Sequence, residues 1–160
     1  MNKADIFALV RGELESQLEV MTASQLEVQA GMTHADNRSE GDKDTRATES
    51  SYLARGQANR VVELGAELAA LDAAKLREFG ADSPIAVSAL VTLEDSDGVD
   101  SHYFLLPGAG GVAVESDGLR VTVVTSQSPI GRALLGKRLD DDVDIRTPQG
   151  VRECTVADVA

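Results

Sequence analysis

The chain has 160 residues and a formal net charge of −12, which argues against a protein that holds bare nucleic acid, because neutralising phosphates requires a basic face. Its hydrophobic content of 42% is typical of a folded, soluble protein and not of a disordered tail. The single cysteine, Cys154, excludes an internal disulfide and a multi-cysteine zinc site, and the two histidines exclude a histidine-rich metal site. Any bound metal would therefore be held by oxygen ligands.

The sequence contains no membrane or export signal that we recognise. No apolar run approaches the roughly 18 residues that a membrane span requires, and the opening residues MNKADIFALVRGE carry acids where a signal peptide would have an apolar core. We therefore expect a cytoplasmic protein with no membrane partner. Residues 1–79 carry 14 acids and 9 Lys/Arg (net −5), and residues 80–160 carry 13 acids and 6 Lys/Arg (net −7), so we expect its partners to present basic surfaces.

Two segments in the first half have the period of paired helices. Between Ile6 and Met32 the apolar positions recur every seven residues, at Phe7, Leu14, Met21 and Val28. In the second segment they are spaced by three, four and three residues, at Val61, Leu64, Leu68 and Leu71. The stripe of the first segment is widened by Ile6, Leu9, Val10 and Leu26. Residues 1–79 are therefore predicted to form an antiparallel helical hairpin, a coiled coil.

A polar stretch, His34–Ser51, separates these two segments and contains no large apolar residue. Its carboxylates are Asp36, Glu40, Asp42, Asp44 and Glu49. The cations Arg38, Lys43 and Arg46 stand among them. We interpret the stretch as the acidic tip of the hairpin, which could hold a metal ion or a basic surface. A solvated loop between helices is the open alternative.

Beyond Pro84 the period becomes that of strands. Strands are predicted at Val87–Leu93, His102–Leu106, Val112–Val114, Leu119–Thr125, Asp140–Arg146 and Val151–Val156. Ser128 as N-cap, Pro129 at the first helical position and Gly136 as a left-handed stop predict one short helix. The prediction is an α+β protein, in which residues 80–160 form a small, mostly antiparallel sheet domain with one short helix.

The glycine run at Gly108–Gly111 superficially resembles a phosphate-binding loop. It lacks the Lys-Ser/Thr pair of such loops, and no helical pattern follows it. We expect a plain loop between strands. Cys154 alternates with apolar strand neighbours and is expected to be a small core residue.

The run SPIGRALLGK at Ser128–Lys137, followed by an acidic turn and a Thr-Pro-x-Gly turn before the last strand, resembles the C-terminal signature of the bacterial Gre-type transcription elongation factors. The segment VTLEDSDG at Val91–Gly98 resembles the first hairpin of that family. The resemblance implies an FKBP-like C-terminal domain that docks on RNA polymerase. The docking residues that it implies are Ser128, Pro129, Gly131, Arg132, Leu135, Gly136 and Lys137.

For the N-terminal half, the resemblance implies a coiled coil that enters the secondary channel of the polymerase. There, acidic tip residues of the family help to hold a catalytic magnesium ion and stimulate cleavage of backtracked RNA. On this chain those roles fall on Asp36 and Glu40, with Asp42 and Asp44 as further candidate magnesium contacts inside the polymerase. Only Ser39-Glu40 matches the cleavage-active tip in place, because Asn37 stands where an Asp is expected, and Gly41, Lys43 and Asp44 replace its later Asn, Glu and Tyr.

The sequence therefore predicts a non-enzymatic, monomeric regulator of RNA polymerase that contacts transcript or DNA only within the polymerase complex. Magnesium would be shared with the polymerase, and no tightly bound cofactor is expected. A non-cleaving modulator that only occupies the channel, and a coiled-coil adaptor without a polymerase partner, are the alternatives. An FKBP-type peptidyl-prolyl isomerase would need an aromatic-lined pocket, and residues 84–160 contain only Tyr103 and Phe104 as aromatics.

Overall fold

The computed structural model describes residues 2–35, 43–80, 82–147 and 150–160, and the side chains of these residues except 31–35, 43–50 and 147. It divides into two compact units, which we treat separately: residues 1–13 together with 67–160, and residues 14–66. The predicted domain division at residue 80 stays a prediction. In the structure, the unit that contains the sheet also takes in the first 13 residues and the segment from residue 67 to residue 79.

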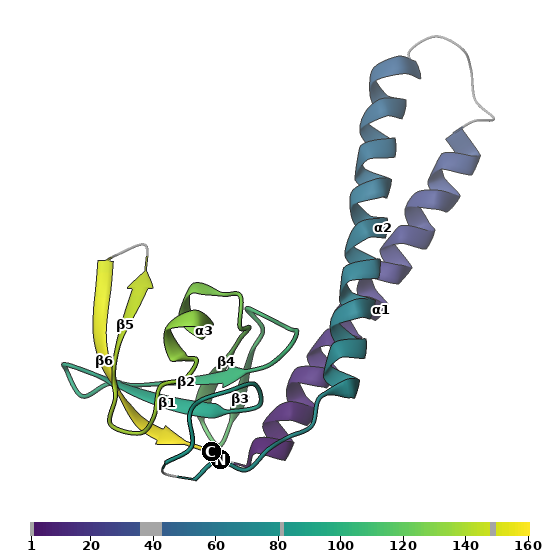
Figure 1. Cartoon of the computed structure of the whole chain (residues 1–160). Coiled ribbons are helices and arrows are strands. Elements are labelled where there is room, and N and C mark those ends of the chain that lie inside the picture. The colour runs from purple at the N-terminus through teal and green to yellow at the C-terminus, as the bar shows by residue number, and fades with distance from the viewer. Residues whose placement is uncertain (1, 36–42, 81, 148–149) are drawn as a thin grey trace. The chain divides into compact units, whose positions relative to one another are not determined.

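Both predicted helices are present. Helix α1 spans Lys3–Ala35 and helix α2 spans Lys43–Ala73 (Figure 1). The extent of the predicted polar tip, His34–Ser51, is wrong, because its first two residues and those from Lys43 onward are helical. The error has a physical reason: arginine, alanine and glutamate are good helix formers, so a polar segment without large apolar residues can still continue an exposed helix.

The two helices run antiparallel, as predicted. In the larger unit, the Arg11 Nε donates to the Asp72 Oδ1 at 2.9 Å. In the smaller unit, the Gln57 Nε2 donates to the Ser24 Oγ at 3.2 Å. Residue numbers therefore fall along α2 as they rise along α1. The predicted widening of the α1 stripe is wrong for Leu9 and Leu26, which are exposed, whereas Ile6, Val10 and Leu14 are buried.

The second half forms one six-stranded sheet with the order β3-β4-β2-β1-β6-β5. Its strands are β1 (Leu90–Asp95), β2 (Asp100–Leu105), β3 (Ala113–Ser116), β4 (Leu119–Val124), β5 (Asp142–Thr147) and β6 (Gly150–Val159). All neighbouring strands are antiparallel except β2 and β4, which are parallel. The short helix α3 spans Pro129–Leu134, between β4 and β5. The predicted α+β class is confirmed.

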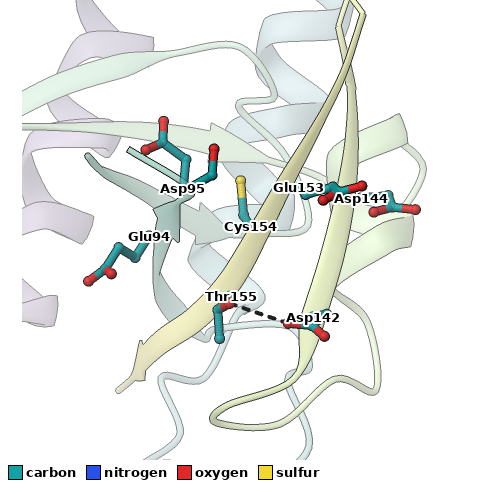
Figure 2. Close-up of a pocket in the computed structure, with 8 residues that line it drawn as sticks. Glu94, Asp95, Asp142, Asp144, Glu153, Cys154 and Thr155 are labelled. Atoms are coloured by element: carbon teal, nitrogen blue, oxygen red, sulfur yellow. Dashed lines mark hydrogen bonds between the residues drawn. The ribbon is translucent and has the colours of Figure 1, made fainter. Parts of the chain in front are cut away.

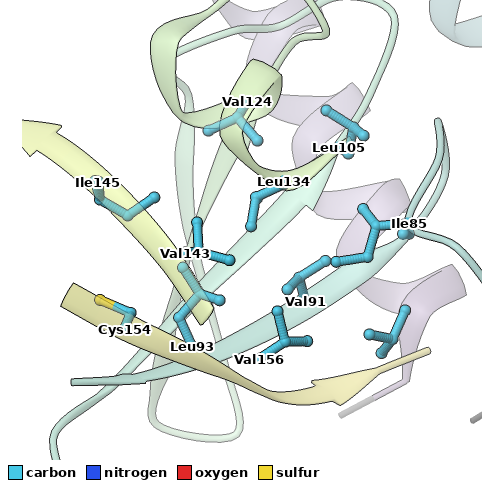
Figure 3. Close-up of a cluster of buried hydrophobic side chains, with 12 residues drawn as sticks. Ile85, Val91, Leu93, Leu105, Val124, Leu134, Val143, Ile145, Cys154 and Val156 are labelled. Atoms are coloured by element: carbon cyan, nitrogen blue, oxygen red, sulfur yellow. The ribbon is translucent and has the colours of Figure 1, made fainter. Parts of the chain in front are cut away.

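The sheet buries apolar side chains on both faces. On one face, side chains from five strands and from α3 form a continuous core (Figure 3). Its members are Ile85, Ala89, Val91, Leu93, Leu105, Val124, Leu134, Val143, Ile145, Cys154, Val156 and Val159. On the other face, the Phe104 ring of β2 meets the Phe7 ring of α1 edge to face, with centroids 6.4 Å apart. The start of α1 is therefore a packing layer of the sheet, and the expected core role of Cys154 is confirmed.

The first strand begins later than the sequence predicts. Residues 87–89 form a turn instead of strand, and Ser88 has a left-handed backbone with φ of 78°. This conformation is fixed by two contacts, because the Ser88 N donates to the Leu105 O and the Ser88 Oγ accepts from the Arg77 N. Arg77 and Leu105 lie 11 and 17 positions from Ser88 in the sequence. The turn therefore cannot be predicted from the local sequence.

Replacing Phe104 by alanine tests the second packing layer. Phe104 is fully buried, so Phe104→Ala is expected to lower the free energy of unfolding by about 3 kcal/mol. Tyr52, which is 68% exposed, provides the control. Tyr52→Ala should change the free energy of unfolding by less than about 0.5 kcal/mol. Urea denaturation followed by circular dichroism measures both, and equal effects would contradict the packing described here.

Candidate functional site

The residues of the motif SPIGRALLGK build α3 and its two ends. At the start, the Ser128 Oγ accepts from the Gly131 N at 3.0 Å and donates to the Thr125 O at 2.8 Å. Pro129 lies in the first turn, where its missing N–H costs nothing. The N-cap predicted at Ser128 is thus confirmed. It connects the helix to the end of β4 as well as capping it.

Gly131 is the residue of α3 at which no larger side chain fits. A Cβ on Gly131 would lie 1.9 Å from the Thr125 O and 2.8 Å from the Thr125 carbonyl carbon. Both atoms belong to the backbone, so they cannot move aside as a flexible side chain would. The glycine in the motif is therefore required for the close approach of α3 to the strand that precedes it.

The far end of α3 is fixed by backbone and side-chain contacts. Gly136 has φ of 79°, and its N donates to the Ile85 O at 2.9 Å. The Lys137 Nζ donates to the Asp142 O at 2.7 Å. These contacts join the segment after α3 to the entry of β1 and to β5. The left-handed stop predicted at Gly136 is confirmed.

The seven docking residues that the family resemblance implies divide by exposure. Gly131 is buried, and Ser128 and Lys137 are half-buried with the contacts described above. The exposed residues are Pro129, Arg132, Leu135 and Gly136. Leu135 is 39% exposed, although its neighbour Leu134 is fully buried in the core. Arg132 and Leu135 are therefore the motif side chains best placed to contact a partner, and the rest of the motif shapes the surface that carries them.

Three of the predicted tip residues, Asp36, Glu40 and Asp42, lie outside the residues that the structure describes. Asp44 is the second residue of α2, but its side chain is also outside the described set. Within the described residues, no group of three or more His, Cys, Asp or Glu side chains is arranged to hold a metal ion. The structure therefore does not test the magnesium contacts predicted for the tip.

A recess of about 640 Å³ is lined by residues of strands β1, β5 and β6 and of the turn after β1 (Figure 2). Its lining residues are Glu94, Asp95, Ser96, Asp142, Asp144, Glu153, Cys154 and Thr155. The side chain of Thr155 donates to the Asp142 Oδ1 at 3.3 Å. The lining contains no aromatic ring, so this recess does not resemble the apolar pocket that an FKBP-type isomerase needs.

The charged side chains at the edge of this recess stabilise the fold. The Asp95 carboxylate accepts from the backbone N–H groups of Val99 and Asp97 and contacts the Arg152 Nη2 at 2.6 Å. The Val99 N–H, followed by the hydrogen bond from Arg152, holds the pKa of Asp95 below its ordinary value. Burial raises the pKa of the Cys154 thiol, which favours the neutral form. Asp95 therefore stabilises the β1–β2 turn, and Cys154 behaves as a core residue.

The glycine run after β2 has a structural role that the sequence does not reveal. A Cβ on Gly108 would lie 3.1 Å from the Glu67 O and 3.2 Å from the Glu67 Cα of helix α2. The Ala109 N donates to the Glu67 Oε2 at 2.8 Å. The expected plain loop is thus also the contact between the sheet and α2. Lys3 and Arg77, both within about 5 Å of the Phe79 ring centroid, add a second contact at the end of the helices.

Comparison with known proteins identifies the C-terminal half. Residues 81–160 match the family model described as "Transcription elongation factor, GreA/GreB, C-term". The chain is 31% identical over 101 residues to transcription elongation factor GreA of Xanthomonas axonopodis pv. citri, a match that covers 63% of this chain and 61% of that protein. It is 28% identical over 154 residues to GreA of Syntrophus aciditrophicus, covering 96% of this chain and 89% of that protein.

The matches to GreA of Pelagibacter ubique and of Xanthomonas span 60% and 61% of those proteins. Among solved structures, the GreA factor homolog 1 (Gfh1) protein of Thermus thermophilus is 22% identical, with a TM-score of 0.41 and coverage of 94% of both chains. At that level of similarity it carries no argument about this chain. None of the helices in the described part of the chain has the length and apolar character to cross a membrane.

Alanine at Gly131 tests the close approach of α3. Gly131→Ala should lower the free energy of unfolding by about 2 kcal/mol or more, because the new methyl group meets backbone atoms. Gly12 in α1 is the matched control, since a Cβ there meets nothing within 4 Å, and Gly12→Ala should raise stability by about 0.5 to 1 kcal/mol. Thermal melts of the two variants should shift in opposite directions. A neutral Gly131→Ala would show that the loop at Thr125 can move.

Proposed function

The chain belongs to the GreA/GreB family of transcription elongation factors, and from this premise we propose that it binds RNA polymerase and regulates elongation. The C-terminal sheet domain docks on the polymerase, and the helical hairpin enters the secondary channel. The observation that carries the proposal is the match of residues 81–160 to the family model, because this segment contains the whole sheet and α3. The domain division at residue 80 forms part of this proposal.

The docking surface is centred on the exposed side chains of α3. Arg132 provides a cation and Leu135 an apolar contact, and both stand on a backbone that Ser128, Gly131 and Gly136 hold in place. A rigid patch loses little conformational entropy on binding, which favours affinity. The protein has no enzymatic activity of its own in this proposal. It acts as a monomer in the cytoplasm and contacts transcript or DNA only within the polymerase complex.

The effect on the polymerase depends on the tip. Asp36 and Glu40 are the carboxylates that we assign to supporting RNA cleavage by the polymerase, with magnesium supplied and shared by the polymerase. The second candidate is a modulator that only fills the channel. It is favoured by Arg38, Lys43 and Arg46 among the tip carboxylates, because each cation weakens the local attraction for a divalent ion.

Substitution on α3 tests the docking surface. Leu135→Ala is expected to weaken binding to core RNA polymerase about tenfold, because it removes an apolar contact at the interface. Leu119 on β4 is 40% exposed, against 39% for Leu135, so Leu119→Ala removes the same group from a surface outside the proposed interface and should change the affinity less than twofold. Biolayer interferometry with the full-length chain measures both constants. Equal losses, or none, would place the interface elsewhere.

Substitution at the tip tests the chemistry. Glu40→Ala and Asp36→Ala should leave polymerase affinity nearly unchanged and lower any stimulated RNA cleavage by about tenfold or more, because they remove carboxylates and leave the docking domain intact. Transcript cleavage in stalled, backtracked complexes provides the measurement. Strong cleavage that survives both substitutions would show that other carboxylates act, with Asp42 and Asp44 next to test.

A further inference from the structure

The hairpin is buried unevenly along its length. We call residues 3–13 and 67–73 the helix roots, and residues 15–30 and 51–63 the distal hairpin. Ile6, Val10 and Leu71 in the roots are fully buried. In the distal hairpin, none of the described residues falls in the buried class. Leu14 and Leu64, next to the distal hairpin in the sequence, are fully buried.

The seam of the distal hairpin mixes polar with apolar side chains, and all of them are only half-buried. Its half-buried residues are Gln17, Leu18, Met21, Ser24, Gln25, Val28, Ala54, Gln57, Ala58, Arg60 and Val61. Gln57 donates to Ser24, but its Oε1 is buried and has no hydrogen-bond partner among the described residues. An unpaired buried oxygen destabilises the folded form relative to a form in which water reaches it. The seam therefore combines half-buried apolar side chains with one buried polar atom that has no partner among the described residues.

Glycine adds a second, independent weakness. Gly56 lies inside α2, is exposed, and a Cβ there would meet nothing within 4 Å. No close approach requires this glycine, yet a glycine in a helix interior costs stability relative to alanine. Most of the stability of a helix in a protein comes from tertiary packing, and the described residues of the distal hairpin include none in the buried class.

We propose that the distal hairpin is an order-on-binding element. In the free protein it opens locally, while the helix roots and the sheet stay folded. A partner surface that packs against the exposed apolar side chains of the distal hairpin, such as Val20, Tyr52 and Val62, closes it. Binding then includes the free-energy cost of ordering the distal hairpin. The smaller the fraction of closed molecules in the free protein, the weaker the observed affinity. Naming RNA polymerase as that partner rests on the proposed function.

Hydrogen exchange on the full-length protein tests the local opening. Amides of residues 15–30 and 51–63 should exchange about a hundredfold faster than those of β1 and β6. Gly56→Ala should slow the distal exchange about fivefold, because it favours the helix without touching the seam. Gly12→Ala, the same change in a helix root, should leave the distal exchange unchanged. Distal amides as protected as those of the sheet would overturn the proposal.

Adding core RNA polymerase tests the coupling. The distal amides should then become protected, and Gly56→Ala should bind up to about fivefold more tightly than the unsubstituted chain, while Gly12→Ala binds equally. Binding without distal protection would overturn the coupling. Failure to bind at all would overturn the proposed function and the coupling together, but not the local opening, which is measured on the free protein.

Discussion

The double-sided burial of strand β2 is the constraint on which the larger unit depends. Phe104 and Leu105 are adjacent, so their side chains point to opposite faces of the sheet, and both are fully buried. Leu105 belongs to the core that Leu134 of α3 completes, whereas Phe104 packs on Phe7 of α1. A sheet with two apolar faces needs a cover on each. One cover comes from the segment after β4, and the other comes from the ends of the hairpin helices.

This constraint explains why the loop at Gly108 and the segment around Phe79 are more than connections. Glu67 is held by the Ala109 N–H, and Lys3 donates to the Arg77 carbonyl beside Phe79. Partial desolvation lowers the pKa of Lys3, and the charge of Glu78 opposes that shift. These contacts keep the helix ends on the sheet.

Much of the fold could be predicted from the sequence because its signals are local. The periodicity of apolar residues predicts α1 and α2. The cap at Ser128 and the glycine at position 136 predict the two ends of α3. The turn at Ser88 could not be predicted, because its left-handed backbone depends on Arg77 and Leu105. The parallel pairing of β2 with β4 likewise has no local signature. Polarity alone misled at residues 43–51, because a solvated loop and an exposed helix share the same composition.

The candidate site was predictable as a segment but not residue by residue. The resemblance selects seven motif residues, and the structure shows that Ser128, Gly131 and Gly136 form the backbone contacts of α3. Only burial distinguishes Leu134, which belongs to the core, from Leu135, which faces outward. A sequence motif does not separate residues required for packing from residues required for contact with a partner. For the tip, the assignment of Asp36, Glu40, Asp42 and Asp44 stays a prediction from the sequence.

In the function that we propose, α3 faces the polymerase while the hairpin occupies the secondary channel. A cryo-electron microscopy structure of the full-length protein bound to core RNA polymerase tests it most directly. We expect Arg132 and Leu135 to lie against the polymerase and the connection between α1 and α2 to lie inside the channel. A complex in which α3 faces solvent and the hairpin lies outside the channel would contradict it.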